Sequence, residues 1–279
     1  SGGLADGGLG LALSRNAIEL KNVGVTRRDN VILAEISLSV EAGSCCAILG
    51  PNGSGKSALM AVLAGYLWPS TGVVSVDGRT YGRVNLADVR SRIGLIEPSR
   101  APKFDDRMCV RDVVATGLFG TIVLPPHRDV DQSQWRRVDE EMVSVGLSEI
   151  GERAYGDLSS GEQMKTLLAR AMVSNAKILL LDEPTVGLDI GSRAACVAVL
   201  DRLLARSRPP TVVIVSHHLD ELPAAVDQIV LMKGGRVVGQ GTPDDLLTSA
   251  HLTALFDCRV EVIRSGERFL ASVRSADLG

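Results

Sequence analysis

The sequence predicts an α/β fold in which a parallel sheet is interrupted by an inserted helical segment. Short continuous apolar runs are typical of strands buried on both faces, and they recur in "SCCAILG", "ILLLD" and "TVVIVS". Between the first and second of these runs, from about residue 106 to 156, the pattern changes to helical periodicity. With 279 residues and 45% hydrophobic content, the chain can form one generous domain or two small ones.

The first elements are expected to be strands that follow a flexible tail, residues 1–17. Residues 17–25 and 35–43 alternate apolar and polar side chains, as half-buried strands do, and residues 71–79 are expected to form an edge element. Residues 44–50 are expected to form a fully buried strand, followed by a glycine-rich loop and a helix. That helix has its apolar residues on one face: Leu59, Met60, Leu63 and Ala64.

The later elements alternate helix, strand and hairpin. An apolar stripe at helical spacing, which we attribute to core packing, consists of Trp135, Val138, Met142 and Val145. Gly146 is the expected stop of this helix. A further helix is expected to bury Cys196, Val199, Leu200, Leu203 and Leu204. A hairpin is expected around Gly234 and Gly235, and residues 242–273 predict a short helical pair and a final hairpin.

Composition and charge argue against several function classes. A formal net charge of −3 with interspersed signs does not suit a dedicated nucleic-acid binder, because neutralising phosphates requires a basic face. Five cysteines without C-x-x-C spacing indicate reduced thiols in a cytosolic protein. No apolar run approaches the roughly 20 residues that a membrane-spanning helix requires. The first residues also lack the pattern of a secretory signal.

The glycine-rich segment "GPNGSGKS" carries the first chemical prediction. It matches the pattern G-x-x-x-x-G-K-[ST], in which backbone N–H groups point at phosphates, Lys56 reaches the terminal phosphates and the Ser57 hydroxyl binds Mg²⁺. An ordinary glycine-rich turn is the alternative, but the strand before it and the helix after it favour phosphate binding. The expected phosphate loop and helix start comprise Gly50, Pro51, Asn52, Gly53, Ser54, Gly55, Lys56, Ser57 and Ala58.

Polar side chains follow two later strands. "ILLLDEP" ends in Asp182 and Glu183, so two carboxylates are delivered to the carboxyl edge of the sheet, where ligands bind in such folds. Asp182 is expected to hold Mg²⁺ and Glu183 to polarise the attacking water. A solvated acidic loop is the alternative. His217 ends "TVVIVSH", where it could touch the γ-phosphate, although a lone histidine there is more often structural or exposed, and His218 is its neighbour.

A second candidate anion site begins at residue 158, in "LSSGEQ", which leads into a helix and which we call the signature segment (residues 158–163). Free N–H groups and the helix dipole make such a start ready to bind an anion. The chain contains, in order, the motifs "GPNGSGKS", "LSSGEQ", "ILLLDEP", "VGLD" and "VSHH". With these motifs, the chain resembles the nucleotide-binding subunits of ATP-binding cassette (ABC) transporters over residues 18–241. The resemblance implies a P-loop NTPase (RecA-like) parallel core with an N-terminal antiparallel β-subdomain and an inserted α-helical subdomain.

The resemblance also gives the second anion site a role. In these proteins two cassettes pack head to tail, so the signature segment of one chain faces the nucleotide of the other. This implies an ATPase whose partner is a second copy of itself or a homologous cassette. Glu183 and His217 would be catalytic, with Ser57 and Asp182 holding Mg²⁺. The residues implied at the partner's ATP are Ser159, Ser160, Gly161 and Glu162, with Asp189 linking the two sites.

Three positions depart from the family pattern. Where relatives commonly place an aromatic residue against adenine, this chain has Arg27 and Arg28, whose guanidinium groups could lie on a purine face or be merely solvated. Where many relatives have a glutamine that senses Mg²⁺, the sequence "IEPS" has Glu97 and Pro98. Glu97 is expected to be a solvated loop residue, with a Mg²⁺ ligand as the alternative. The third departure is mild: Ser160 replaces the commoner second glycine.

The resemblance implies a core of residues 18–97 and 161–241, a helical subdomain of residues 98–160 and a C-terminal extension of residues 242–279. That extension loosely resembles the tails of bacterial metal-chelate and molybdate importer ATPases. An importer is favoured because its ATPase and membrane domains are on separate chains.

Without a membrane-spanning segment, transport requires integral membrane permease subunits as partners and a peripheral position on the inner face of the cell membrane. Residues 108–126 are apolar enough for docking, although subdomain packing explains most of them and leaves residues 118–126 for the surface. The alternative is a soluble ABC ATPase that acts on nucleic acid or ribosomes, which only the missing glutamine favours.

Overall fold

The computed structural model describes residues 16–127 and 129–273. The first strand, β1, begins at Asn16, so residues 16 and 17 belong to it and not to the expected tail. The rest of that tail lies outside the described residues.

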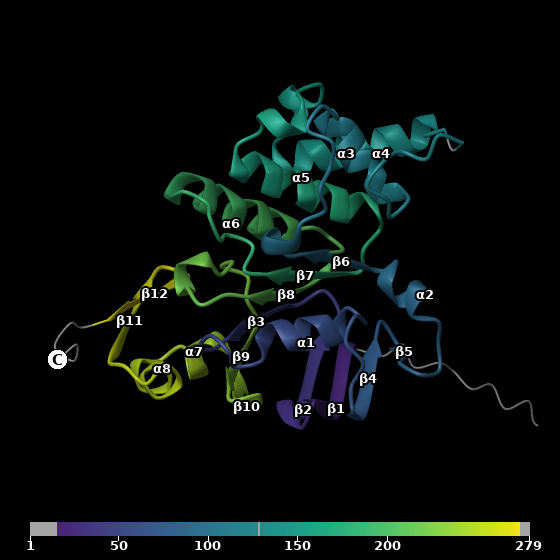
Figure 1. The fold of residues 1–279 in the computed structure, drawn as a ribbon. Helices are drawn as coiled ribbons and strands as arrows, with labels where there is room; N and C mark the ends of the chain where they lie inside the picture. The colour runs from purple at the N-terminus through teal and green to yellow at the C-terminus, as the bar shows by residue number, and fades with distance from the viewer. Residues whose placement is uncertain (1–15, 128, 274–279) are drawn as a thin grey trace, which may run out of the picture.

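A six-stranded sheet forms the centre of the molecule, in the order β10-β9-β3-β8-β7-β6 (Figure 1). All neighbouring pairs are parallel except β9 and β10, which form the predicted hairpin. Its strands are β3 (Cys45–Leu49), β6 (Ile93–Ile96), β7 (Ile178–Asp182), β8 (Thr211–Val215), β9 (Gln228–Lys233) and β10 (Arg236–Gly241). Every residue of β3, β7 and β8 is buried, which confirms the prediction from their continuous apolar runs.

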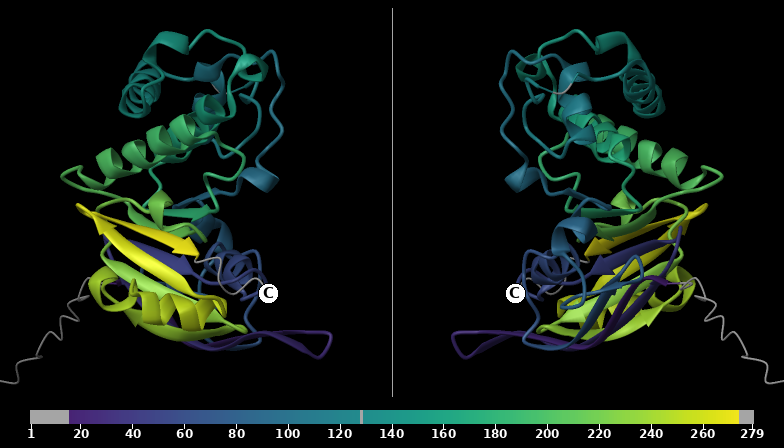
Figure 2. Two further views of the ribbon diagram at one scale, coloured as in Figure 1. Left: turned by 90° about the vertical axis from the view of Figure 1, so that its left-hand side faces the viewer. Right: turned by 90° about the vertical axis from the view of Figure 1, so that its right-hand side faces the viewer.

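A second, antiparallel sheet confirms the predicted N-terminal strands. Its order is β2-β1-β4-β5, with β1 (Asn16–Arg27), β2 (Asn30–Glu41), β4 (Thr71–Val76) and β5 (Arg79–Thr80). The edge strands are β2 and the short β5, so the expectation of an edge at residues 71–79 is wrong for β4, which lies between β1 and β5. The β1–β2 hairpin projects beyond the body of the molecule (Figure 2).

Helices cover the two faces of the central sheet differently. Helix α1 (Lys56–Leu63) lies between the two sheets, and its buried Leu59, Met60 and Leu63 share a core with β1, β2 and β4. The other face is covered by α5 (Ser160–Val173) and α6 (Ile190–Leu204), beyond which lie α3 (Val110–Ala115) and α4 (Gln132–Val145). Helix α2 (Leu86–Arg90) stands at the side, next to β6.

The predicted helical stripes are confirmed with two adjustments. Val138, Met142 and Val145 of α4 are buried, whereas Trp135 is half-buried beneath the guanidinium of Arg111. Gly146 ends α4 with φ +76°, a conformation that favours glycine. In α6 the inward side chains are buried as predicted, except for the half-buried Leu204 at its end.

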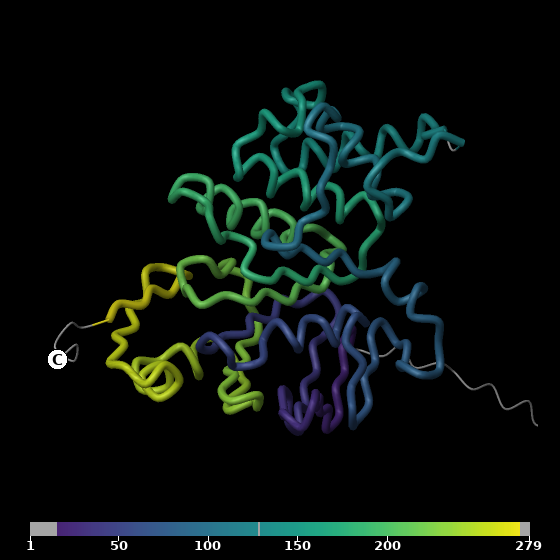
Figure 3. The backbone as a smooth tube through the Cα atoms, viewed as in Figure 1, coloured from purple at the N-terminus to yellow at the C-terminus, as the bar shows by residue number. Residues whose placement is uncertain are grey.

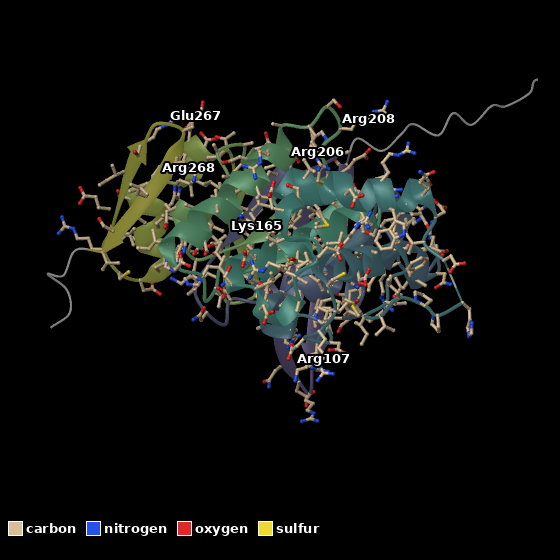
Figure 4. The ribbon with its side chains drawn as sticks, turned by 90° about the horizontal axis from the view of Figure 1, so that it is seen from above. Arg107, Lys165, Arg206, Arg208, Glu267 and Arg268 are labelled. Atoms are coloured by element: carbon tan, nitrogen blue, oxygen red, sulfur yellow. The ribbon has the colours of Figure 1, made fainter. Side chains whose placement is uncertain are left out.

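Two ion pairs join the C-terminal end of α6 to neighbouring elements. Arg206, just after α6, lies 2.7 Å from the carboxylate of Glu141 on α4. Arg268 reaches from the C-terminal hairpin to Asp201 on α6, at 2.8 Å (Figure 4). The C-terminal segment therefore packs on the core.

The C-terminal residues confirm the predicted helical pair and hairpin. They form α7 (Pro243–Leu246), α8 (Ser249–Phe256), β11 (Val260–Ser265) and β12 (Arg268–Val273). None of the helices in the described part of the chain has the length and apolar character needed to cross a bilayer.

The apolar segment of residues 108–126, which includes α3, divides into a buried and an exposed part. Val113 and Val114 are fully buried, whereas Ile122 and Val123 are 51% and 53% exposed. The exposed part falls within the expected surface stretch of residues 118–126.

Close packing between this segment and α5 predicts a cost for any side chain at Gly117. A Cβ atom there would overlap the carbonyl oxygen of Arg170 and lie 2.8 Å from Cγ1 of Val173. Gly117→Ala should therefore lower the free energy of unfolding by about 1–3 kcal/mol, measured by chemical denaturation. Gly239→Ala is the matched control, because its Cβ would meet nothing closer than 3.5 Å. Equal stability of the two variants would contradict this packing.

Candidate nucleotide-binding site

The carboxyl ends of four adjacent parallel strands bring the predicted chemical groups together. In the order β3, β8, β7 and β6, these strands lead into the phosphate loop, His217, the Asp182–Glu183 pair and Glu97. Figure 3 shows how chain segments far apart in sequence run side by side at this place. We call it the carboxyl edge, and it is where ligands bind in open parallel sheets.

The phosphate loop depends on glycine at three positions. Gly53 and Gly55 have φ values of +78° and +99°, which side chains rarely adopt. A Cβ atom at Gly50 would overlap the carbonyl oxygen of Met232, so this position needs glycine for space. The Ser54 hydroxyl is buried without a hydrogen-bond partner. The loop therefore has the shape and the polar groups of a phosphate cradle.

Lys56 is buried at the start of α1 and donates to its own loop. Its Nζ atom donates to the carbonyl oxygens of Gly50 at 2.7 Å and Pro51 at 2.9 Å. Burial lowers the pKa of Lys56, while the charges of Glu183 and Asp182 act in the opposite direction. An added anion next to this ammonium would favour its charged form further.

Asp182 is the most enclosed acid of the site. Its side chain is 6% exposed, and Oδ1 is buried without a hydrogen-bond partner. Burial raises the pKa of Asp182, a hydrogen bond with Ser57 lowers it, and the negative charges of Glu97 and Glu183 raise it. A cation beside this carboxylate would reverse the effect of burial.

Glu183 and His217 face each other across the ends of β7 and β8. Nδ1 of His217 lies 3.4 Å from Oε1 of Glu183, and both side chains are about one-third exposed, at 37% and 33%. The Glu183 N–H donates to Val215 at 3.0 Å, and its φ is +49°, a strained value for a non-glycine residue. His218 contacts the His217 ring instead. His217 is thus the histidine beside the acid.

The signature segment leads into α5, on the face of the central sheet opposite to α1. Ser159 is the N-cap of α5, and its side chain and backbone exchange hydrogen bonds with Glu162. Ser159 and Ser160 are exposed, and Gly161 is buried. The backbone hydrogen bond from Ser159 is the largest of several effects that lower the pKa of Glu162.

A contact missed by sequence reasoning joins the signature segment to the start of α6. A Cβ atom at Gly161 would lie 2.7 Å from the hydroxyl of Ser192. That hydroxyl donates to Asp189, the N-cap of α6, at 2.7 Å. The spacing of Asp189 and Ser192 is a capping pattern that could have indicated the local bond, but not the packing of α6 on α5.

Arg27 is not at the carboxyl edge itself. It lies exposed at the tip of the β1–β2 hairpin, paired with Asn30. The part of β2 that contacts the phosphate loop is further along, where Leu33 approaches Gly55.

The fold and the carboxyl edge define a P-loop nucleotide hydrolase. The family model described as ABC transporter matches residues 33–186. The chain belongs to this family.

Two curated relatives match nearly the whole chain. The uncharacterized ABC transporter ATP-binding protein YmeB of Lactococcus lactis is 31% identical over 253 residues, covering 90% of this chain and 96% of the relative. The hemin import ATP-binding protein HmuV of Rhizobium meliloti is 31% identical over 253 residues, covering 88% and 93%.

Solved structures agree on the fold. A metal-chelate type ABC transporter in an inward-facing conformation matches with a TM-score of 0.75 at 24% identity, covering 93% of this chain and 97% of that one. CbiO1 from Clostridium perfringens, part of the ABC transporter complex cbiONQ, matches with a TM-score of 0.73 at 25% identity, covering 86% and 94%. The family match and the two sequence relatives, by contrast, show that the chain is an ATP-hydrolysing subunit that powers transport, and they favour this function over one on nucleic acid or ribosomes.

The position of Lys56 predicts loss of nucleotide binding when it is removed. Lys56→Ala deletes the cation that would meet the terminal phosphates, and ATP affinity measured by calorimetry should fall about 100-fold or more. Lys177→Ala is the control, because that exposed lysine precedes β7 at the opposite edge of the sheet. Unchanged ATP affinity in Lys56→Ala would contradict the site.

Proposed function

We propose that this chain binds ATP with Mg²⁺ and hydrolyses it as one of two cassettes packed head to tail, driving transport through separate permease subunits. The observation that carries the proposal is the convergence of the phosphate loop, Asp182, Glu183 and His217 at one sheet edge. The signature segment, which lies elsewhere on the chain, is left for a partner's nucleotide.

The oxygen donors of the site fit Mg²⁺. Asp182 has a buried carboxylate oxygen without a partner, and the Ser57 hydroxyl is already bonded to this side chain. Among the described residues no group of three or more acidic, histidine or cysteine side chains is arranged to hold a metal alone. This suits Mg²⁺, which commonly keeps waters and takes substrate phosphates as ligands. When bound, it would neutralise phosphate charge.

Each of the remaining groups has a separate role in binding or hydrolysis. Lys56 turns from its loop carbonyls to the terminal phosphates, and Glu183 accepts a hydrogen bond from the attacking water and orients it. His217, held beside Glu183, donates to the γ-phosphate. Arg27 supplies a planar cation at the hairpin tip that can lie against the adenine.

The composite site accounts for the exposure of Ser159 and Ser160 in the signature segment. The Ser159 hydroxyl can keep accepting from the Glu162 N–H while its hydrogen turns from the Glu162 carboxylate to a partner's γ-phosphate. Gly161 and Asp189 are joined through Ser192, so Asp189 connects the signature segment with the start of α6. ATP then favours the closed dimer because each triphosphate contacts both chains.

The exposed Ile122 and Val123 form a docking surface for a permease, which holds the chain at the inner face of the membrane. Relatives named for hemin, cobalamin and manganese transport favour import over export.

Glu183→Gln should retain ATP and stop turnover, because the amide keeps the shape of the side chain but loses the base. Hydrolysis is expected to fall about 10²–10⁴-fold, and gel filtration with ATP and Mg²⁺ should show a trapped dimer. Glu140→Gln, at an exposed position of α4, should behave like the unchanged protein. A Glu183→Gln chain that stays monomeric at high concentration would count against the composite site.

Ser159→Arg should block hydrolysis while ATP binding by the isolated chain stays nearly intact, since Ser159 serves the partner's nucleotide. The control is Ser148→Arg, at an exposed position away from the signature segment. Mixing Ser159→Arg with Lys56→Ala chains gives dimers with one intact and one doubly broken site. Recovery of activity in the mixture is the expected result. If the mixture shows no activity and also no ATP-induced dimerisation, the head-to-tail arrangement is overturned.

A further inference from the structure

The register between β6 and β7 places Glu97 beside Asp182. The two strands are parallel, and the last pair in their ladder joins Ile96 to Leu181. Glu97 continues the extended backbone, with φ −132° and ψ 98°. Residues in register on neighbouring parallel strands lie about 4.8 Å apart and point to the same face. The next pair in this register is Glu97 and Asp182.

Glu97 lies just after β6, in a loop as expected, but it is half-buried there. Its side chain is 20% exposed. Oε1 of Glu97 accepts a hydrogen bond from the Ser99 hydroxyl at 3.2 Å and lies 3.3 Å from Nε of Arg100, and both of these partners are close in sequence. Arg100 is itself 79% exposed, so this ion pair is screened by solvent and adds little to hold the carboxylate in place.

Two neighbouring carboxylates at a buried edge repel each other, and the repulsion needs a counter-charge. Asp182 is 6% exposed and has an oxygen without a hydrogen-bond partner. The charge of Lys56 lowers the pKa of Asp182 and so offsets part of this repulsion, but its Nζ donates to two carbonyl oxygens of the loop and leaves Oδ1 of Asp182 without a hydrogen bond. A divalent cation next to Asp182 would satisfy the free oxygen and relieve the repulsion from Glu97.

We propose that Glu97 is a positioning carboxylate for the nucleotide's Mg²⁺, acting beside Asp182 in place of the amide that many relatives supply from the following residue. In this chain that following residue is Pro98, which has no side-chain amide and no N–H. The inference rests on the proposed Mg²⁺-ATP site. Unlike an amide, the carboxylate adds negative charge, so it strengthens the hold on the cation and weakens binding of ATP without metal.

These opposite effects give a sharp test. ATP-induced thermal stabilisation is measured over a Mg²⁺ titration and, separately, ATP affinity is measured in EDTA by calorimetry. Glu97→Gln should raise the Mg²⁺ concentration for half-maximal stabilisation about tenfold and should bind metal-free ATP several-fold more tightly. A variant with a damaged fold would instead show both a smaller stabilisation by ATP and a weaker affinity for ATP in EDTA. Glu97→Asp keeps the charge and should bind metal-free ATP like the unchanged protein.

Glu149→Gln, an exposed change of the same charge, is the control for net charge and should alter neither quantity. An unchanged Mg²⁺ midpoint in Glu97→Gln, or weaker binding of metal-free ATP, would overturn the inference about Glu97 alone. If the unchanged protein shows no stabilisation by ATP at any Mg²⁺ concentration, the proposed nucleotide site fails instead.

Discussion

Parallel pairing of β3, β8, β7 and β6 in a fixed register is the constraint on which the site depends. Backbone hydrogen bonds set that register, and a slip of one residue would turn every side chain to the opposite face. Asp182 pairs with Val215, and the Glu183 N–H donates to the same residue's carbonyl oxygen one step later. This extra bond accompanies the positive φ of Glu183, where the chain leaves the strand and its side chain meets His217.

The same constraint concentrates negative charge. Glu97, Asp182 and Glu183 all end strands at the carboxyl edge, while Lys56 is the cation that faces them there. A triphosphate would add further negative charge, which a buried edge cannot accommodate without cations. The proposed Mg²⁺ would therefore balance the charge of the acids and the triphosphate together.

Local patterns predicted most of the fold and part of the site. The glycine loop, the helical stripe around Val138 and the hairpin at Gly234 depend on neighbours in sequence, so their patterns were sufficient. The position of Glu97 was not predictable, because it depends on the register between β6 and β7, which are distant in sequence. The contact of Gly161 with Ser192 depends on how α5 packs on α6, and the two-residue β5 is too short to carry a pattern.

A short path connects the carboxyl edge to the signature segment within one chain. Strand β7 ends at Asp182, and α6 is capped by Asp189, with the intervening residues closed by hydrogen bonds from Val186 to Glu183 and from Leu188 to Thr185. Leu188 is buried, so this turn is packed as well as bonded. Because Ser192 bonds Asp189 and packs against Gly161, the start of α6 lies directly on the signature segment. The eight residues from Asp182 to Asp189 therefore join the residues proposed to meet a chain's own nucleotide to the segment proposed to meet its partner's.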